Sequence, residues 1–155
     1  MDVPEATDRQ ISNACYNVAG IYVKHCNFKK ALHFYRESLS LERKIELEHH
    51  NQHQSISSVS RPHGSNHQST VPLAHRLSTI IQIASICLQI DDFEDALQYY
   101  LDAMKLCFAY DDHTFVLQDI GIIQMGIDAC YKGRISNYVN ESCKTNGIFN
   151  CASAA

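Results

Sequence analysis

The sequence contains two copies of one segment. Residues 28–35 (FKKALHFY) align without gaps on residues 93–100 (FEDALQYY). The likeness extends upstream in the same alignment, where residues 17–22 (NVAGIY) lie opposite residues 82–87 (QIASIC). Similarity over this length predicts two copies of one structural unit that stack through apolar faces.

Each copy has the residue spacing of two amphipathic helices. In the first copy, apolar residues recur at intervals of three and four, for example at Ala14, Val18 and Ile21. A turn near residues 25–27 separates the two helices. Capping boxes are predicted where Thr7 precedes Gln10 and where Asp91 precedes Glu94. The pattern therefore predicts an all-α fold.

This pattern resembles the tetratricopeptide repeat, a helix-turn-helix unit of about 34 residues that stacks into a solenoid. The family has small residues where its helices approach closely, and the matching positions here are Ala19, Ala31 and Ser38 in the first copy and Ala84, Ala96 and Ala103 in the second. Its conserved aromatic position matches Tyr35 and Tyr100. Its turn glycine is replaced by Cys26 and Asp91.

A partial third copy follows the second. Gly126 and Gly133 lie equally far beyond Ala84 and Asp91, so the resemblance places Gly126 at the small position and Gly133 at the turn. The implied period, roughly 42 residues, is longer than the standard unit. It is similar to that of the long-helix subclass found in kinesin light chains and spindle-orientation scaffolds. On that period, the interval between the first two copies contains an insertion.

The predicted organisation is two full repeats plus one partial repeat. The segments are a first repeat at 8–48, a flexible His- and Ser-rich insertion at 49–71, a second repeat at 72–111, the first helix of a partial third repeat at 112–133, and an irregular or disordered tail at 134–155. The chain is accordingly either a scaffold in its own right or a fragment or variant of a larger repeat scaffold with no independent activity.

Composition excludes several classes of protein. With 13 Lys+Arg against 17 Asp+Glu and no basic run, we expect neither a nucleic-acid partner nor a membrane partner. No signal peptide or membrane span is recognisable, so we expect a cytoplasmic protein, with nuclear or cytoskeletal association as alternatives. Seven cysteines without a CxxC motif favour neither a disulfide framework nor a zinc ribbon, and most should be small buried residues.

No catalytic motif is present, and no cofactor is expected. The sequence has no Gly-rich phosphate loop, no GxSxG elbow and no paired-histidine metalloprotease motif, so we expect no enzyme activity. The insertion contains several histidines that could chelate zinc or nickel: His49, His50, His53, His63 and His67. A metal-binding protein is therefore the alternative function, although the same composition fits a flexible loop and no metal ligand is assigned.

The resemblance implies a non-catalytic intracellular scaffold for protein–protein interaction. In that family the first helices line a concave groove that holds a partner's peptide or helix. The implied binding residues are Asn13, Tyr16, Asn17, Lys24, Ile81, Gln82, Ser85, Gln89, Ile123 and Ile127. Asn17 matches the asparagine with which kinesin light chains contact cargo backbones. The isoleucines have an equally good alternative role in packing against later residues, and an uncovered C-terminal end would favour self-association.

Overall fold

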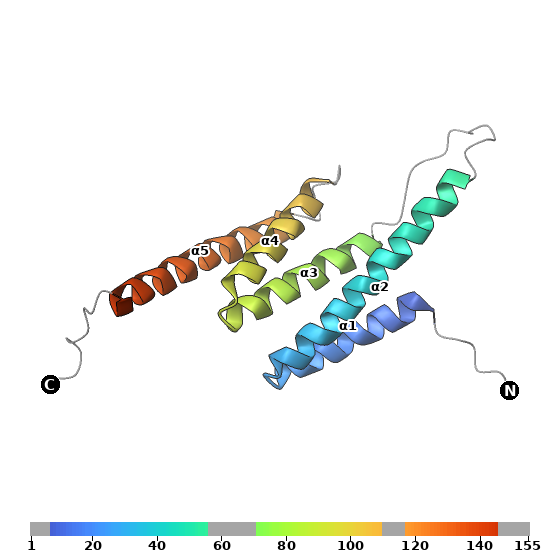
Figure 1. Cartoon of the computed structure of the whole chain (residues 1–155). Coiled ribbons are helices and arrows are strands. Elements are labelled where there is room, and N and C mark those ends of the chain that lie inside the picture. The colour runs from blue at the N-terminus through green and yellow to red at the C-terminus, as the bar shows by residue number, and fades with distance from the viewer. Residues whose placement is uncertain (1–6, 56–70, 110–116, 146–155) are drawn as a thin grey trace.

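The chain is all-α throughout the residues that its computed structural model describes, which are 7–55, 71–109 and 117–145 (Figure 1). The helices are α1 (Asp8–Lys24), α2 (Phe28–Ser55), α3 (Val71–Gln89), α4 (Phe93–Phe108) and α5 (Leu117–Thr145). They pack in chain order as antiparallel, hairpin-like pairs, and α5 contacts both α4 and α3 (Figure 1). The predicted fold class, all-α, is confirmed in these ranges.

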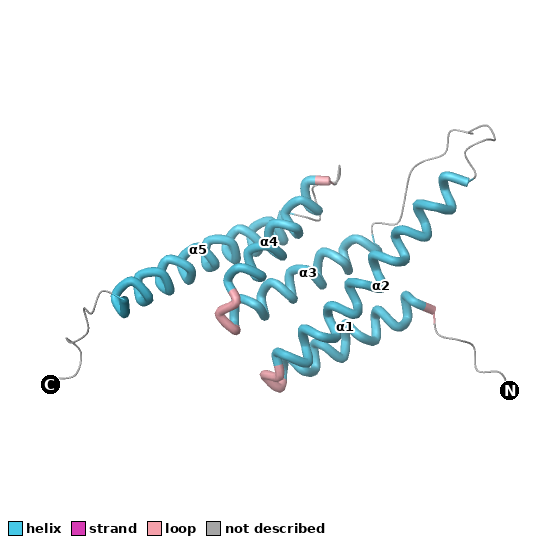
Figure 2. The backbone as a smooth tube through the Cα atoms, in the orientation of Figure 1, coloured by secondary structure: helices cyan, strands magenta, loops and turns pink. Residues whose placement is uncertain are grey.

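The α1–α2 hairpin is closed by two backbone hydrogen bonds after the last residue of α1. The Cys26 amide donates to the Val23 carbonyl, and the Asn27 amide donates to the Tyr22 carbonyl, both at 2.9 Å. This pair of bonds is a Schellman motif, which requires a left-handed residue after the helix. Cys26 supplies it with a φ of 55°, and the turn is drawn in pink in Figure 2.

The α3–α4 hairpin has the same turn. The Asp91 amide donates to the Leu88 carbonyl at 3.3 Å, the Asp92 amide donates to the Cys87 carbonyl at 2.9 Å, and Asp91 has a φ of 61°. Cys26 and Asp91 are thus the two residues that reverse the chain, as the sequence predicts. Both carry a Cβ in a conformation that glycine adopts more readily.

The capping predictions are partly confirmed. Thr7 and Gln10 form a complete capping box at the start of α1. The cap of α4 is Asp92, not Asp91, because the left-handed turn uses Asp91 and leaves the next carboxylate to accept from the Asp95 amide at 3.3 Å.

Replacing Cys26 by glycine should stabilise the protein by roughly 0.5–1 kcal/mol, because glycine removes the cost of placing a Cβ in the left-handed region. Asp91→Gly should give a smaller gain, since aspartate tolerates this region better than cysteine. Urea denaturation measures both. Destabilisation by Cys26→Gly would contradict this account of the turn.

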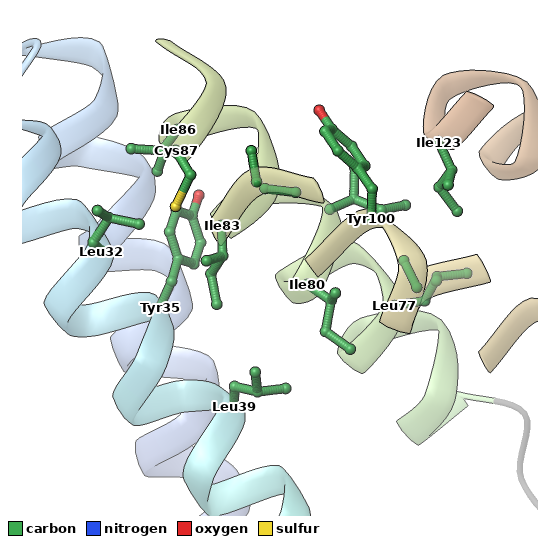
Figure 3. Close-up of a cluster of buried hydrophobic side chains, with 14 of the residues drawn as sticks. Leu32, Tyr35, Leu39, Leu77, Ile80, Ile83, Ile86, Cys87, Tyr100 and Ile123 are labelled. Atoms are coloured by element: carbon green, nitrogen blue, oxygen red, sulfur yellow. The ribbon is translucent and has the colours of Figure 1, made fainter. Parts of the chain in front are cut away.

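The core contains the small and aromatic positions singled out in the sequence. The five alanines at the predicted helix contacts are fully buried, as is Ser38, and the two tyrosines are 3% exposed. Figure 3 shows Tyr35 and Tyr100 among the aliphatic side chains of α3, with Ile123 of α5 beyond Tyr100. The predicted packing positions are confirmed.

Helix α5 docks on α4 at two glycines. A Cβ on Gly126 would lie 2.2 Å from Cζ of Tyr100, and a Cβ on Gly133 would lie 2.3 Å from Cε1 of Phe93. Only residues without a side chain fit beneath these rings. Because Phe93 is the first residue of α4, α5 extends past the end of α4 after Gly133 (Figure 1).

Two predicted boundaries are corrected. Gly133 does not form a turn but lies within α5, where the Phe93 ring occupies the space that a side chain at residue 133 would need. The tail predicted as irregular at 134–155 is helical as far as Thr145. The insertion predicted to begin at residue 49 is still part of α2 up to Ser55. Residues 56–70 and 146–155, on which the remaining parts of these predictions fall, lie outside the described residues.

Replacing Gly126 by alanine should destabilise the protein by about 1–3 kcal/mol, because the buried Tyr100 ring must shift. Gly121→Ala is the matched control: its added Cβ meets nothing within 4 Å, so higher helix propensity should give up to about 1 kcal/mol of stabilisation. Thermal melts of both variants at one dilute concentration test this pair. Equal effects of the two substitutions would contradict the docking of α5.

Candidate functional site

Five of the predicted binding residues lie on accessible sides of α1 and α3. Asn13, Asn17 and Lys24 are exposed and are spaced to share one side of α1, while Gln89 is exposed and Gln82 half-buried on α3. We call these five residues the amide face. None of the four amide side chains forms a hydrogen bond within the residues that the structure describes.

Two tyrosine hydroxyl groups, those of Tyr16 and Tyr100, form hydrogen bonds with serines of α3. Tyr16 Oη and Ser78 Oγ are 2.8 Å apart and connect α1 with α3. Tyr100 Oη is 3.1 Å from Ser85 Oγ, and burial raises the pKa of Tyr100. Tyr16 and Ser85, which were predicted to bind a partner, therefore already hydrogen-bond within the protein.

The apolar part of the predicted site is largely core. Ile81 is 7% exposed and Ile123 is fully buried, so neither lies on a free surface. Ile123 lies one helical turn before Gly126, which places it on the side of α5 that meets α4. Ile127 is half-buried and packs against the same core. The alternative interpretation, that the isoleucines have a packing role, is the better description of Ile123.

Sequence reasoning missed a polar cluster where α1, α2 and α3 meet. The Ser12 hydroxyl is 3.0 Å from Ser38 Oγ and 3.3 Å from Glu42 Oε1, and the same carboxylate oxygen pairs with Nδ1 of His75. Glu42 is 10% exposed, and its second oxygen is buried without a hydrogen-bond partner among the residues that the structure describes. The signal in the sequence was Ser12, a polar residue two helical turns before the buried Ala19 on the same face of α1.

Neighbouring contacts extend this cluster along α3. The Tyr16 ring packs on His75 with 4.7 Å between ring centroids, and Arg76 pairs with Glu46 of α2. The Ser12 hydroxyl bonds to the carboxylate and not to the imidazole, so the cluster lacks the serine–histidine contact that activates a nucleophile. Its geometry is that of a polar joint between the first hairpin and α3.

Three of the described cysteines lie in environments that suppress thiol reactivity. Cys87, Cys107 and Cys130 are buried, as predicted for most cysteines, and burial raises the pKa of each thiol. For Cys87 burial, together with the Asp92 carboxylate, raises the pKa to about 11. Cys26 is exposed in the first turn. A catalytic thiolate requires the opposite shift, toward a lower pKa.

Iodoacetamide at neutral pH should modify Cys26 and spare Cys87. With a pKa of about 11, Cys87 is thiolate in fewer than about one molecule in a thousand at pH 7.5, and its modification should accelerate as the pH rises toward that pKa. Peptide mass spectrometry resolves the two sites, and the protein unfolded in urea is the control in which both react. Equal rates in the folded protein would refute the burial of Cys87.

The described ranges contain neither a cluster of metal ligands nor a helix that could span a membrane. Among these residues, no group of three or more His, Cys, Asp or Glu side chains could hold a metal ion. The histidine side chains of the predicted insertion lie outside the part described. No helix in that part is long and apolar enough to cross a bilayer.

The chain was compared with protein-family models, curated proteins and solved structures, and none of them matches it. The structure by itself defines the class of this chain: within the described residues it is an all-α protein whose antiparallel helices pack in sequential pairs.

Proposed function

We propose that this chain is a tetratricopeptide-like repeat protein that acts as a non-catalytic scaffold and binds a partner's peptide or helix on the amide face. The observation that carries the proposal is the set of accessible amides on α1 and α3, which have no hydrogen-bond partners within the described residues. An amide side chain can donate and accept at once, which suits it to the backbone of an extended peptide.

Matching local geometry supports the repeat. Both hairpins turn at a left-handed residue, Cys26 or Asp91, and these two residues are equivalent in the alignment of the copies. Both second helices direct a buried tyrosine hydroxyl toward the first helix: Tyr35 Oη lies 3.7 Å from where a Cβ on Gly20 would be, and Tyr100 Oη lies 3.1 Å from Ser85 Oγ. Gly20 and Ser85 are equivalent in the same alignment.

The half-buried Tyr16 favours a fixed arrangement of the two first helices, α1 and α3. Tyr16 connects α1 to α3 through Ser78, and its ring packs at a tilt against His75, so the helices that carry the amide face are joined directly. A rigid platform lowers the entropy cost of binding a flexible peptide. Lys24 adds a single positive charge at the end of α1, which favours a partner with a nearby carboxylate.

The double variant Asn17→Ala/Gln82→Ala should weaken peptide binding about tenfold to a hundredfold, since each lost hydrogen bond contributes roughly 0.5–1.5 kcal/mol. Phage display on the immobilised wild-type chain would supply the peptide, and isothermal titration would measure its affinity for both proteins. Thermal stability should change little, because neither amide hydrogen-bonds within the described residues.

Lys29→Ala on α2 is the control, because Lys29 is exposed and lies outside the amide face. It should leave both affinity and melting temperature unchanged. Equal peptide affinity of the double variant and the wild type would rule out the amide face as the binding surface. A large fall in melting temperature would instead assign the two amides a structural role.

A further inference from the structure

Helix α5 carries a stripe of residues on the side that faces away from α4. Residues at alternating intervals of four and three lie along one line of a helix, and here they are Gly121, Met125, Asp128, Lys132, Ile135 and Val139. We call these six residues the α5 seam. Met125 is 67% exposed, Ile135 63% and Val139 50%, and both charged residues are exposed.

The seam has the features of a contact line between two helices. Large apolar side chains rarely stand in a row on a free helix surface unless they meet another surface. The four-three spacing is that of helices that wind around each other. No atom of the described residues lies within 4 Å of where a Cβ on Gly121 would be, so a second helix can approach closely there.

The order of the residues makes the seam complementary to itself when two copies run antiparallel. With a two-fold axis midway between Asp128 and Lys132, Asp128 of one copy faces Lys132 of the other, and the reverse pair forms at the same time. Met125 then faces Ile135, and Gly121 faces the larger Val139. A parallel pairing would instead place like charges opposite each other, which is destabilising.

Asp128 and Lys132 are also available for such a pairing. Neither forms an ion pair with another residue in the part of the chain that the structure describes. By contrast, Arg134 on the flank of α5 pairs with Glu94 of α4 at 2.9 Å and is used inside the protein. A second copy can therefore supply an ion-pair partner for each of these two seam charges.

We propose that two copies of this chain associate through an antiparallel pairing of their α5 seams about a two-fold axis, with two symmetric Asp128–Lys132 ion pairs at the centre. Such an interface is isologous, because the same surface of each copy contributes both halves. The proposal does not depend on partner binding, since the amide face lies on α1 and α3.

Sedimentation velocity over a concentration series of the full chain tests the pairing. The wild type should form a dimer as its concentration is raised to about 200 μM, within the range of weak specific association. Asp128→Lys and Lys132→Asp should each weaken dimerisation at least about tenfold, because each change places two like-charge pairs at the axis. Met125→Glu should do the same without altering either seam charge.

Mixing the two charge variants gives the decisive measurement. A chain with Asp128→Lys presents two lysines, a chain with Lys132→Asp presents two aspartates, and an equal mixture should regain wild-type dimerisation although each variant alone is weakened. The double exchange Asp128→Lys/Lys132→Asp should also dimerise like the wild type. Recovery in the mixture shows as well that both variants are folded.

Lys29→Glu on α2 is the control for a change of net charge and should leave dimerisation unchanged. A monomeric wild type at the highest concentration would overturn the proposal. So would a dimer that persists in all three seam variants, because it would use another surface. Failure of the mixture to associate would exclude the antiparallel register.

Discussion

The contact between the Tyr100 ring and the bare backbone of Gly126 determines how closely α5 can approach α4. A single added carbon at Gly126 would overlap the ring, and that ring is itself held by burial and by the hydroxyl contact to Ser85. The packing therefore depends on a small residue in one helix meeting an aromatic residue in the helix before it. Since interiors are close-packed, the small position leaves little freedom in how the helices are spaced. The position of α5, and with it that of the α5 seam, follows from that spacing.

The internal similarity in the sequence was sufficient to predict the two hairpins but not the third helix. Apolar spacing and the small positions located α1 to α4, and even the non-glycine turn residues Cys26 and Asp91 were placed correctly. Gly133 was misread because glycine serves two purposes: it permits a left-handed turn, and it makes room for a neighbouring side chain. A single sequence does not distinguish them. Only the position of Phe93 in space shows that the second purpose applies.

The polar cluster shows why the candidate site was harder to predict than the fold. In the alignment of the two copies, Ser12, Ser38 and Glu42 correspond to Leu77, Ala103 and Cys107, which are all buried. The first hairpin thus has polar residues where the second has apolar ones, and Glu42 reaches His75 on α3. Groups of this kind stabilise little in total but penalise any alternative docking that would leave them unpaired. Because the pairing spans three helices, spacing along one chain segment does not reveal it.

A comparison of α3 with α5 shows how the exposed side of α5 differs from the equivalent side of α3. When Ala84 is aligned with Gly126, Ile83 and Ile86 of α3, both buried, correspond to Met125 and Asp128 of α5. Met125, the equivalent of Ile83, is apolar but exposed, and Asp128, the equivalent of Ile86, carries a charge. Ile83 and Ile86 lie beside Tyr35 and Leu32 of α2 (Figure 3). A covering helix that packed on α5 as α2 packs on α3 would therefore bury the Asp128 carboxylate, which is costly without a cation opposite it. The surface that can cover α5 must therefore supply a positive charge at that point, and the seam of a second copy, read in the opposite direction, places Lys132 there.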